Sequence, residues 1–360
     1  MPSVSEWEAL RFNQLEPEAL IQAFMRHPPV DFTIIKEGDS DLLPKFATSF
    51  DLMTTLEPAL RRRLQAWVNR WGMAGWLRPR ALFIGTTVSE YALLPRNEEP
   101  ENLIADLLQR YRRHYAFIII KDVPVQSPLL EDADNTCSRQ WSEQAQAAGM
   151  FALKGQALAW VDVGDADEET WLNRFSKSRR KDFRRKLRQR HELEITTLYA
   201  GDPCFQSESL LRSWYALYEA VYQQSDTHFD FLTPAFFADL LQEDSGAVIF
   251  VYHHQGVLLG YNFCFEVGDK LVDKYIGMKY PEAREHHLYF VSWFHNLAYA
   301  RSRGLTRYVA GWTDPEVKRS LGAALTMTQH WVYIRNPWLR WILGRLRFLF
   351  EADARVESSS

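Results

Sequence analysis

The sequence predicts an α/β fold built on a mixed sheet. Between residues 80 and 190, β-rich apolar runs alternate with helical runs, as in chains whose strands are joined by helices. Beyond residue 246, three β-rich runs follow one another across the short turns Gln255-Gly256 and Gly268-Asp269, the pattern of a hairpin meander. Apolar residues make up 46% of the 360-residue chain, enough for a sizeable core, and the length predicts two domains or one duplicated fold.

The first half is predicted to begin with helices and to continue as alternating strands and helices. Residues 1–76 are expected to be mostly helical, with loops near 27–29 and 38–39. The later elements are expected to be a strand at 80–88, a helix at 100–114, a strand at 115–121, a helix at 135–148, one or two strands over 151–163 broken at Gly155, and a long helix at 167–190.

The second half is predicted to be a helix followed by the meander and a closing α/β segment. The helix at 209–224 places apolar residues at the spacing of a core-facing stripe, and Pro234 begins a short helix. The later elements are expected to be strands at 247–253, 257–267 and 270–280, a loop at 281–287, a helix at 288–303 ended by Gly304, a strand at 307–311, a helix at 315–321 with Asp314 as N-cap, and a strand at 326–334.

Composition and the positions of the cysteines indicate which kinds of site and which cellular location to expect. The cysteines Cys137, Cys204 and Cys264 are far apart and fit neither a disulfide framework nor a metal-ligand pattern, so we expect reduced thiols and no metal. The N-terminal residues do not resemble a secretory leader, and no uncharged apolar run approaches 18 residues, so a cytoplasmic location is expected. The net charge of −4 gives no global attraction to nucleic acid, so any such contact requires a local patch.

The element order from residue 209 to 334 resembles the GNAT (Gcn5-related N-acetyltransferase) fold, with its core at about 247–331. Two stretches are similar to the FemAB-like and BioF2-like branch of that superfamily: 176–194 (SKSRRKDFRRKLRQRHELE) and 288–331. In the second, a helix ending in glycine precedes a strand, a Glu-x-Lys-x-x-x-Gly helix and a His-Trp strand. The matching positions are Gly304, Glu316, Lys318, Gly322, His330 and Trp331. The resemblance covers about 81–336.

The resemblance implies two tandem GNAT-like halves. Residues 1–195 would hold a helical segment and an incomplete half ending in a basic helix, 196–336 the catalytic half, and 337–360 an amphipathic helix and tail. The implied activity is transfer of an acyl group from acyl-CoA or a similar donor to an amine of a small molecule or envelope precursor. One alternative is a Fem-type ligase, which takes its amino acid from aminoacyl-tRNA; another is a non-catalytic GNAT-fold binding module.

The resemblance also implies where the chemistry would lie. In the GNAT fold the third meander strand and the next strand diverge, which would place Tyr275, Ile276 and Gly277 along a slot for the acyl group. Lys318 would face the donor phosphate or the reacting carbonyl, and Glu316, two residues away, cannot share its helix face. Candidates for a general base are Glu266, Asp273 and His330, unless a water chain removes the amine proton.

The phosphates of the donor would be held by basic residues. The loop at 281–287 lacks the Arg/Gln-x-x-Gly-x-Gly/Ala pattern of CoA-dependent GNATs, so its phosphate contacts would come from Arg284, His286 and His287 unless that loop is merely solvated. Residues 177–190 contain nine Lys or Arg, and either form a solvated face or bind tRNA, a nucleotide-linked precursor or the CoA phosphates. The residues assigned to that contact are Arg180, Arg184, Arg185 and Arg188.

The last helix, expected at 337–352, has a narrow polar strip and a broad apolar side. We expect it to dock on its own domain or on a second subunit; the alternative is peripheral contact with the inner membrane face through its Trp and Arg residues. The sequence does not indicate an oligomeric state.

Overall fold

The computed structural model describes residues 11–36, 43–49, 79–96, 99–164, 167–225, 229–338 and 340. Its centre is a mixed sheet of 11 strands, which confirms the predicted fold class. In spatial order the strands are β2 (Thr33–Ile34), β3 (Lys45–Ser49), β4 (Arg80–Ile84), β6 (Phe117–Pro124), β13 (Ala324–Ile334), β7 (Phe151–Asp162), β12 (Arg307–Gly311), β11 (Lys270–Met278), β10 (Val257–Val267), β9 (Ala247–His254) and β8 (Glu194–Tyr199). The short strands β1 (Arg11–Phe12) and β5 (Leu94–Pro95) pair separately.

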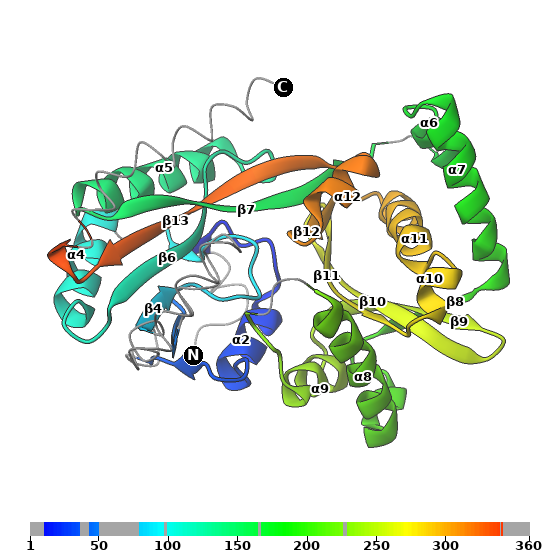
Figure 1. Cartoon of the computed structure of the whole chain (residues 1–360), viewed down its shortest axis with the longest axis horizontal. Helices are drawn as coiled ribbons and strands as arrows, with labels where there is room; N and C mark the ends of the chain where they lie inside the picture. Colours follow the sequence, from blue (N-terminus) through cyan, green and yellow to red (C-terminus); the bar gives the residue numbers. More distant parts are fainter. Residues whose placement is uncertain are drawn as a thin grey trace, which may run out of the picture.

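Helices cover both faces of this sheet (Figure 1). The first half contributes α2 (Glu18–Arg26), α4 (Pro100–Tyr111), α5 (Asp132–Ala147), α6 (Glu168–Leu172), α7 (Lys177–Leu187) and the 3-10 turn η3 (Arg188–Glu192). The second half contributes η4 (Pro203–Gln206), α8 (Glu208–Gln224), α9 (Pro234–Gln242), α10 (Glu282–Glu285), α11 (Leu288–Ser302) and α12 (Pro315–Ser320). The element order predicted for the second half is confirmed, with a short helix, α10, inside the predicted loop.

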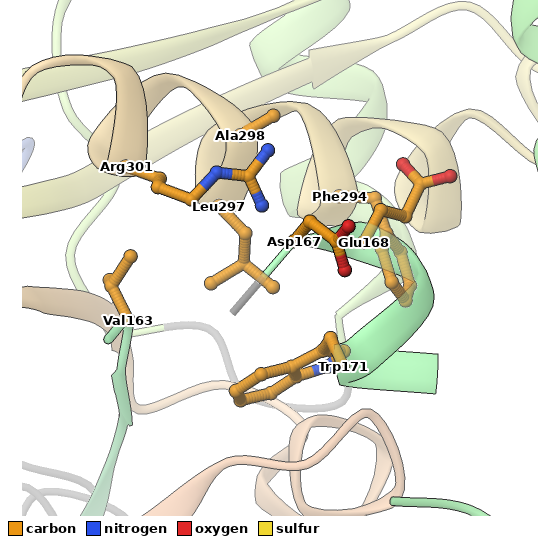
Figure 2. A pocket seen from close by; sticks show the side chains of 8 residues that line it. All are labelled: Val163, Asp167, Glu168, Trp171, Phe294, Leu297, Ala298 and Arg301. Carbon is orange, nitrogen blue, oxygen red and sulfur yellow. The ribbon is translucent and has the colours of Figure 1, made fainter. Parts of the chain in front are cut away.

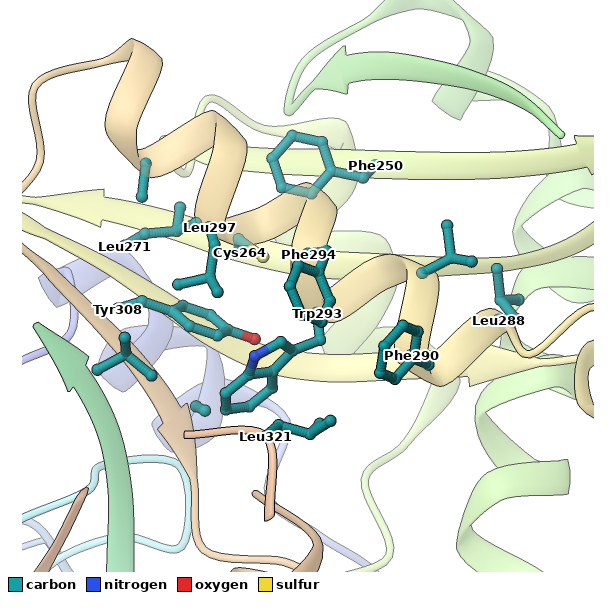
Figure 3. Close-up of a cluster of buried hydrophobic side chains, with 14 of the residues drawn as sticks. Phe250, Cys264, Leu271, Leu288, Phe290, Trp293, Phe294, Leu297, Tyr308 and Leu321 are labelled. Atoms are coloured by element: carbon teal, nitrogen blue, oxygen red, sulfur yellow. The ribbon is translucent and has the colours of Figure 1, made fainter. Parts of the chain in front are cut away.

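The meander of the second half separates two hydrophobic clusters. On one face, Leu271 and Phe250 of the strands pack with Trp293, Phe294 and other apolar residues of α11 (Figure 3). On the other face, apolar side chains of α8, α9 and α2 pack against the same strands. Because side chains of successive strand residues alternate between faces, each meander strand contributes to both clusters. The meander is therefore covered by apolar side chains on both of its faces.

The last strand joins the two halves. β13 lies between β6 and β7 and pairs antiparallel with both. β7 is one continuous strand, so the predicted break at Gly155 is wrong, but the register of β7 with β13 does shift there, where Gly155 and Gln156 stand opposite Thr328. A Cβ at Gly155 would lie 2.2 Å from Thr328 Oγ1 of β13, so glycine permits close approach of the two strands here.

Three local predictions are corrected. Residues 167–190 do not form one helix, because Asp167 accepts from the Thr170 N–H and Ser176 from the Arg179 N–H, which starts two separate helices. Lys45–Ser49, in the segment expected to be mostly helical, forms β3 because it pairs with β4. Asp314 adopts a left-handed conformation (φ 50°) and its side chain does not cap α12.

The structure leaves two larger predictions untested. The division of the chain at 195/196 stays a prediction. The helix expected at 337–352 lies almost entirely outside the described residues. Across the described ranges, none of the helices combines the length and apolar character that crossing a bilayer requires.

Candidate functional site

The strands β11 and β12 stop pairing part of the way along β11. They run parallel and pair at three positions, from Lys270↔Arg307 to Val272↔Val309. β11 then continues to Met278 on β10 alone. We call the region between the two strands beyond Val272 the splay. It lies where the GNAT resemblance placed the acyl slot.

A β-bulge in β11 sets the direction of the side chains at the splay. The register with β10 shifts so that Asp273 faces Cys264 while Tyr275 faces Phe263, and Lys274 is the extra residue. A bulge breaks the regular alternation and re-aims a side chain. Asp273 consequently contacts α11, Tyr275 lies against α8 and α9, and Lys274 reaches the first half of the chain.

Lys274 is the centre of a buried ionic cluster. Its Nζ donates to Glu90 Oε1 and lies 3.3 Å from Glu16 Oε1, and the three side chains are 6%, 3% and 0% exposed. The Glu90 backbone N–H also donates to Glu16 Oε1, at 2.6 Å. Glu16 precedes α2, and Glu90 lies in the loop after β4. The ionic cluster therefore connects the first half of the chain to the bulge.

Burial and the neighbouring charges shift the pKa values within the ionic cluster. Desolvation raises the pKa of Glu16 to about 7, with a further increase from the charge of Glu90 and a decrease from Lys274. Burial alone would lower the pKa of Lys274, but the two carboxylates outweigh it and raise that pKa above its ordinary value. Lys274 is therefore protonated at neutral pH, whereas Glu16 can gain or lose a proton there.

Lys318 lies at the other side of the splay. It is 4% exposed, its Nζ donates to Thr313 Oγ1 at 3.4 Å, and this nitrogen lies 3.8 Å from where a Cβ of Gly311 would be. Desolvation lowers the pKa of Lys318 to about 8, against the charges of Asp273, Glu90 and Asp314. Glu316 is exposed and pairs with Arg319, so of these two only the lysine faces inward.

Several buried polar atoms around the splay have no hydrogen-bond partner among the described residues. They are Glu16 Oε2, Glu90 Oε2, Tyr275 OH and Trp312 Nε1. An unpaired buried polar atom is costly and in native proteins calls for an explanation, such as a bound molecule. These atoms offer a substrate both acceptors and donors.

Of the other predicted catalytic residues, Asp273 lies closest to this set. Its buried carboxylate accepts from Tyr308 OH at 2.8 Å and from the side-chain amides of Asn262 and Asn296. Burial raises its pKa, although these hydrogen bonds oppose the increase. Asp273 is thus anchored in a hydrogen-bond network beside Lys318.

The remaining candidates for a general base have other partners. Glu266 accepts from Tyr299 OH and Arg303 on the α11 face, near the end of β10. His330 Nδ1 accepts from the Asp122 backbone N–H at 3.0 Å, and burial lowers its pKa. The neutral imidazole of His330 therefore accepts a hydrogen bond from the backbone through Nδ1, which is a structural role.

Gly277 and Ile276 lie further along β11. A Cβ at Gly277 would be 2.3 Å from the Tyr261 ring, so this glycine makes room for Tyr261. Ile276 is half-buried against the cluster on the α11 face. Both roles in donor binding stay predictions.

Of the predicted phosphate-binding residues, one from the basic helix contacts one from the loop at 281–287. Arg185 of α7 lies 3.4 Å from His287 Nε2 at the start of α11. Arg284 contacts Gln224, and His286 lies 3.5 Å from Glu192. Arg180 and Arg184 are bonded to Asn173 and Glu169, and Arg188 is exposed. The basic helix is thus partly neutralised by its own neighbours.

A small cavity lies elsewhere, between α6 and α11 (Figure 2). Its walls are mostly apolar, with Asp167, Glu168 and Arg301 at the rim. Neither the ionic cluster nor Lys318 lines it. We place the functional site at the splay, because Glu16, Glu90, Lys274 and Lys318 are buried there and several of the unpaired polar atoms lie beside them.

Sequence reasoning missed Glu16, Glu90 and Lys274. The run Asp273-Lys274-Tyr275 places three polar side chains in succession within a β-rich stretch, which could have indicated the bulge. No local signal relates positions 16 and 90 to it, because they meet only in the folded sheet.

The raised pKa of Glu16 predicts a pH-dependent stability difference. Its folded-state pKa, about 7, exceeds the ordinary value of 4.5, so the stabilisation is fully present below pH 4.5 and is lost as pH rises through 7. Relative to Glu16→Gln, the wild type should lose roughly 3 kcal/mol of unfolding free energy across this window. Urea unfolding of both proteins at pH 4.5, 6 and 8 measures the difference. A flat difference would contradict it.

Two GNAT-like halves on one continuous sheet, with a splay after Val272, define the class: this is a protein of tandem GNAT architecture. Residues 127–357 match the FemAB-like family, described as peptidoglycan biosynthesis/recognition. The chain belongs to the FemAB-like family, whose members are transferases.

Two solved structures with TM-scores above 0.5 agree with this fold. One is the C-terminal domain of a putative lysylphosphatidylglycerol synthetase from Agrobacterium fabrum, at 11% identity and TM-score 0.52, covering 91% of this chain and 93% of that one. Another is L-PGS from Bacillus licheniformis, also at 11% identity and TM-score 0.52, with coverages of 95% and 98%. FemX is similar at 12% identity and TM-score 0.49, with coverages of 90% and 97%. No curated protein sequence matches the chain.

Proposed function

We propose that this protein transfers an aminoacyl group from an ester-activated donor, aminoacyl-tRNA, to an amine of an envelope precursor. The observation that carries the proposal is the buried pair Glu16 and Glu90 at the splay, each with one unpaired carboxylate oxygen. One lysine, Lys274, balances one of the two carboxylates, and the raised pKa of Glu16 leaves the second only partly ionised while no further cation is present. A substrate carrying an ammonium group would complete the balance.

An aminoacyl group carries such an ammonium and a simple acyl group does not. Buried charges are tolerated when they are paired, and cost several kcal/mol when they are not. An aminoacyl ester placed in the splay can donate its α-ammonium to Glu16 Oε2 and Glu90 Oε2. The acyl part of acetyl-CoA would leave both oxygens unpaired. This difference favours the aminoacyl donor.

Lys318 is the residue assigned to the reacting carbonyl. In the transfer, the acceptor nitrogen attacks the ester carbon, the C–N bond forms, the ester C–O bond breaks, and the proton lost by the amine leaves with the released hydroxyl. Negative charge develops on the carbonyl oxygen, and a buried ammonium stabilises it more strongly than an exposed one would. With a pKa of about 8, Lys318 is mostly charged at neutral pH.

The surface beside the splay supports an RNA donor. The loop at 281–287 has no glycine, in contrast to the CoA-binding pattern, and contacts the basic helix α7 through His287 and Arg185. Lys177, Lys181 and Arg188 are exposed. Phosphate contacts of this kind are sequence-independent and salt-sensitive. The name of one similar protein, a putative lysylphosphatidylglycerol synthetase, also describes a lysyl product.

The donor can be tested by following a label. The purified full chain is incubated with tRNA charged with labelled amino acids, or with labelled acyl-CoA, and with an envelope-precursor extract rich in amines. Movement of label from tRNA into an amide that survives mild base, lost in Lys318→Ala, is the expected result. Label arriving only from acyl-CoA overturns the aminoacyl donor while keeping a transferase. No transfer from either donor overturns the proposal.

A further inference from the structure

Three potential metal ligands from distant parts of the chain meet on the side of the molecule where α7 ends. Glu192 closes η3, His254 ends β9, and His286 follows α10. One ligand atom from each lies within 4.8 Å of the other two. His286 Nδ1 is 3.5 Å from Glu192 Oε2, and the two imidazole centroids are 4.1 Å apart. We propose that these residues bind a divalent ion of the zinc class.

The ligand set has the chemistry of such a site. Imidazole nitrogens and a carboxylate bind Zn²⁺ at about 2.0–2.2 Å, so ligand atoms around one ion lie about 3–3.5 Å apart. The His286–Glu192 distance already has this value, and a small side-chain rotation brings in His254. Three protein ligands leave at least one position for water, as in exchangeable zinc sites.

The surroundings of His286 Nδ1 favour a metal ligand over a solvated polar group. The His286 side chain is 14% exposed, and its Nδ1 is buried; apart from Glu192 Oε2 at 3.5 Å, which makes no hydrogen bond with it, this nitrogen has no hydrogen-bond partner among the described residues. A polar nitrogen in that position would ordinarily face water or accept a hydrogen bond. A bound ion would satisfy it and would neutralise Glu192, which is otherwise exposed.

The fold holds the ligands in place. Glu194 of β8 pairs with His253 of β9, so the turn carrying Glu192 enters the sheet beside the end of β9. The His286 backbone N–H donates to the Glu282 carbonyl in the turn of α10. An ion here would therefore fasten the end of the basic helix to the loop between β11 and α11. This inference does not depend on the proposed function.

Direct metal binding tests the site. The full chain is treated with chelator, dialysed, and titrated calorimetrically with Zn²⁺, beside His254→Ala, His286→Ala and Glu192→Gln. His253→Ala is the matched control, because its side chain points to the opposite face of β9. The wild type and the control are expected to bind one ion. The three ligand variants should lose at least about 10-fold in affinity, the loss that even outer-shell substitutions cause.

A second measurement distinguishes metal binding at this site from metal binding by the cysteines. Co²⁺ bound by two imidazoles and a carboxylate absorbs in the visible range without a thiolate charge-transfer band. That spectrum in the wild type, lost in His286→Ala, supports the site. A thiolate band, an absence of binding, or equal Zn²⁺ affinity in all four variants would overturn it.

Discussion

Lys274→Met should reduce the unfolding free energy by about 3–5 kcal/mol, the cost of leaving buried charges without their partner. Methionine keeps most of the volume of the side chain but removes the ammonium between Glu16 and Glu90, which are 0% and 3% exposed. The two carboxylates would then repel each other away from water. Urea unfolding at pH 7, followed by tryptophan fluorescence, measures the loss.

The same urea experiment shows whether the stability is lost through unpaired charge or through altered packing. The triple variant Glu16→Gln, Glu90→Gln, Lys274→Met has no buried charge at these positions and keeps similar shapes, so it should recover most of the lost stability. Lys270→Met is the matched control on the same strand, because Lys270 pairs with the half-exposed Asp269. If the triple variant is as unstable as the single one, the charge argument is wrong.

The topology could be predicted because its signals are local. The two meander turns, Pro234 and Gly304 each mark an element boundary within a few residues. The same reasoning could have divided 167–190, since Asp167 and Ser176 are both good N-caps. The single helix predicted over 167–190 overlooked both caps.

The site was only partly predictable, for a physical reason. Lys318 was assigned through the family motif, and its burial in the structure agrees with an inward-facing lysine. Glu16 and Glu90 contribute from positions 258 and 184 residues before Lys274, which no spacing rule relates. Their meeting depends on β13 closing the sheet between β6 and β7 and on one extra residue in β11.

Lys318→Ala should reduce kcat/KM for aminoacyl transfer about 10²–10³-fold, the effect of removing one oxyanion donor. The effect of Lys318→Met on stability should have the opposite sign to that of Lys274→Met. Burial holds the folded-state pKa of Lys318 at about 8, below the ordinary 10.5, so its charge costs stability at neutral pH. Lys318→Met should therefore unfold at the same or a higher urea concentration than the wild type.

The pH dependence of kcat/KM distinguishes a Lys318 that stabilises the oxyanion from a Lys318 that acts as a base. If its ammonium stabilises the oxyanion, wild-type kcat/KM falls as pH rises through about 8, where the proton is lost. The Lys318→Arg variant, if active, should not show this fall, because guanidinium stays charged. Arg319→Ala, an exposed position on the same helix, is the control and should keep the wild-type profile. Full activity in Lys318→Ala would assign Lys318 to the fold alone, and a rise above pH 8 would make it a base rather than an oxyanion donor.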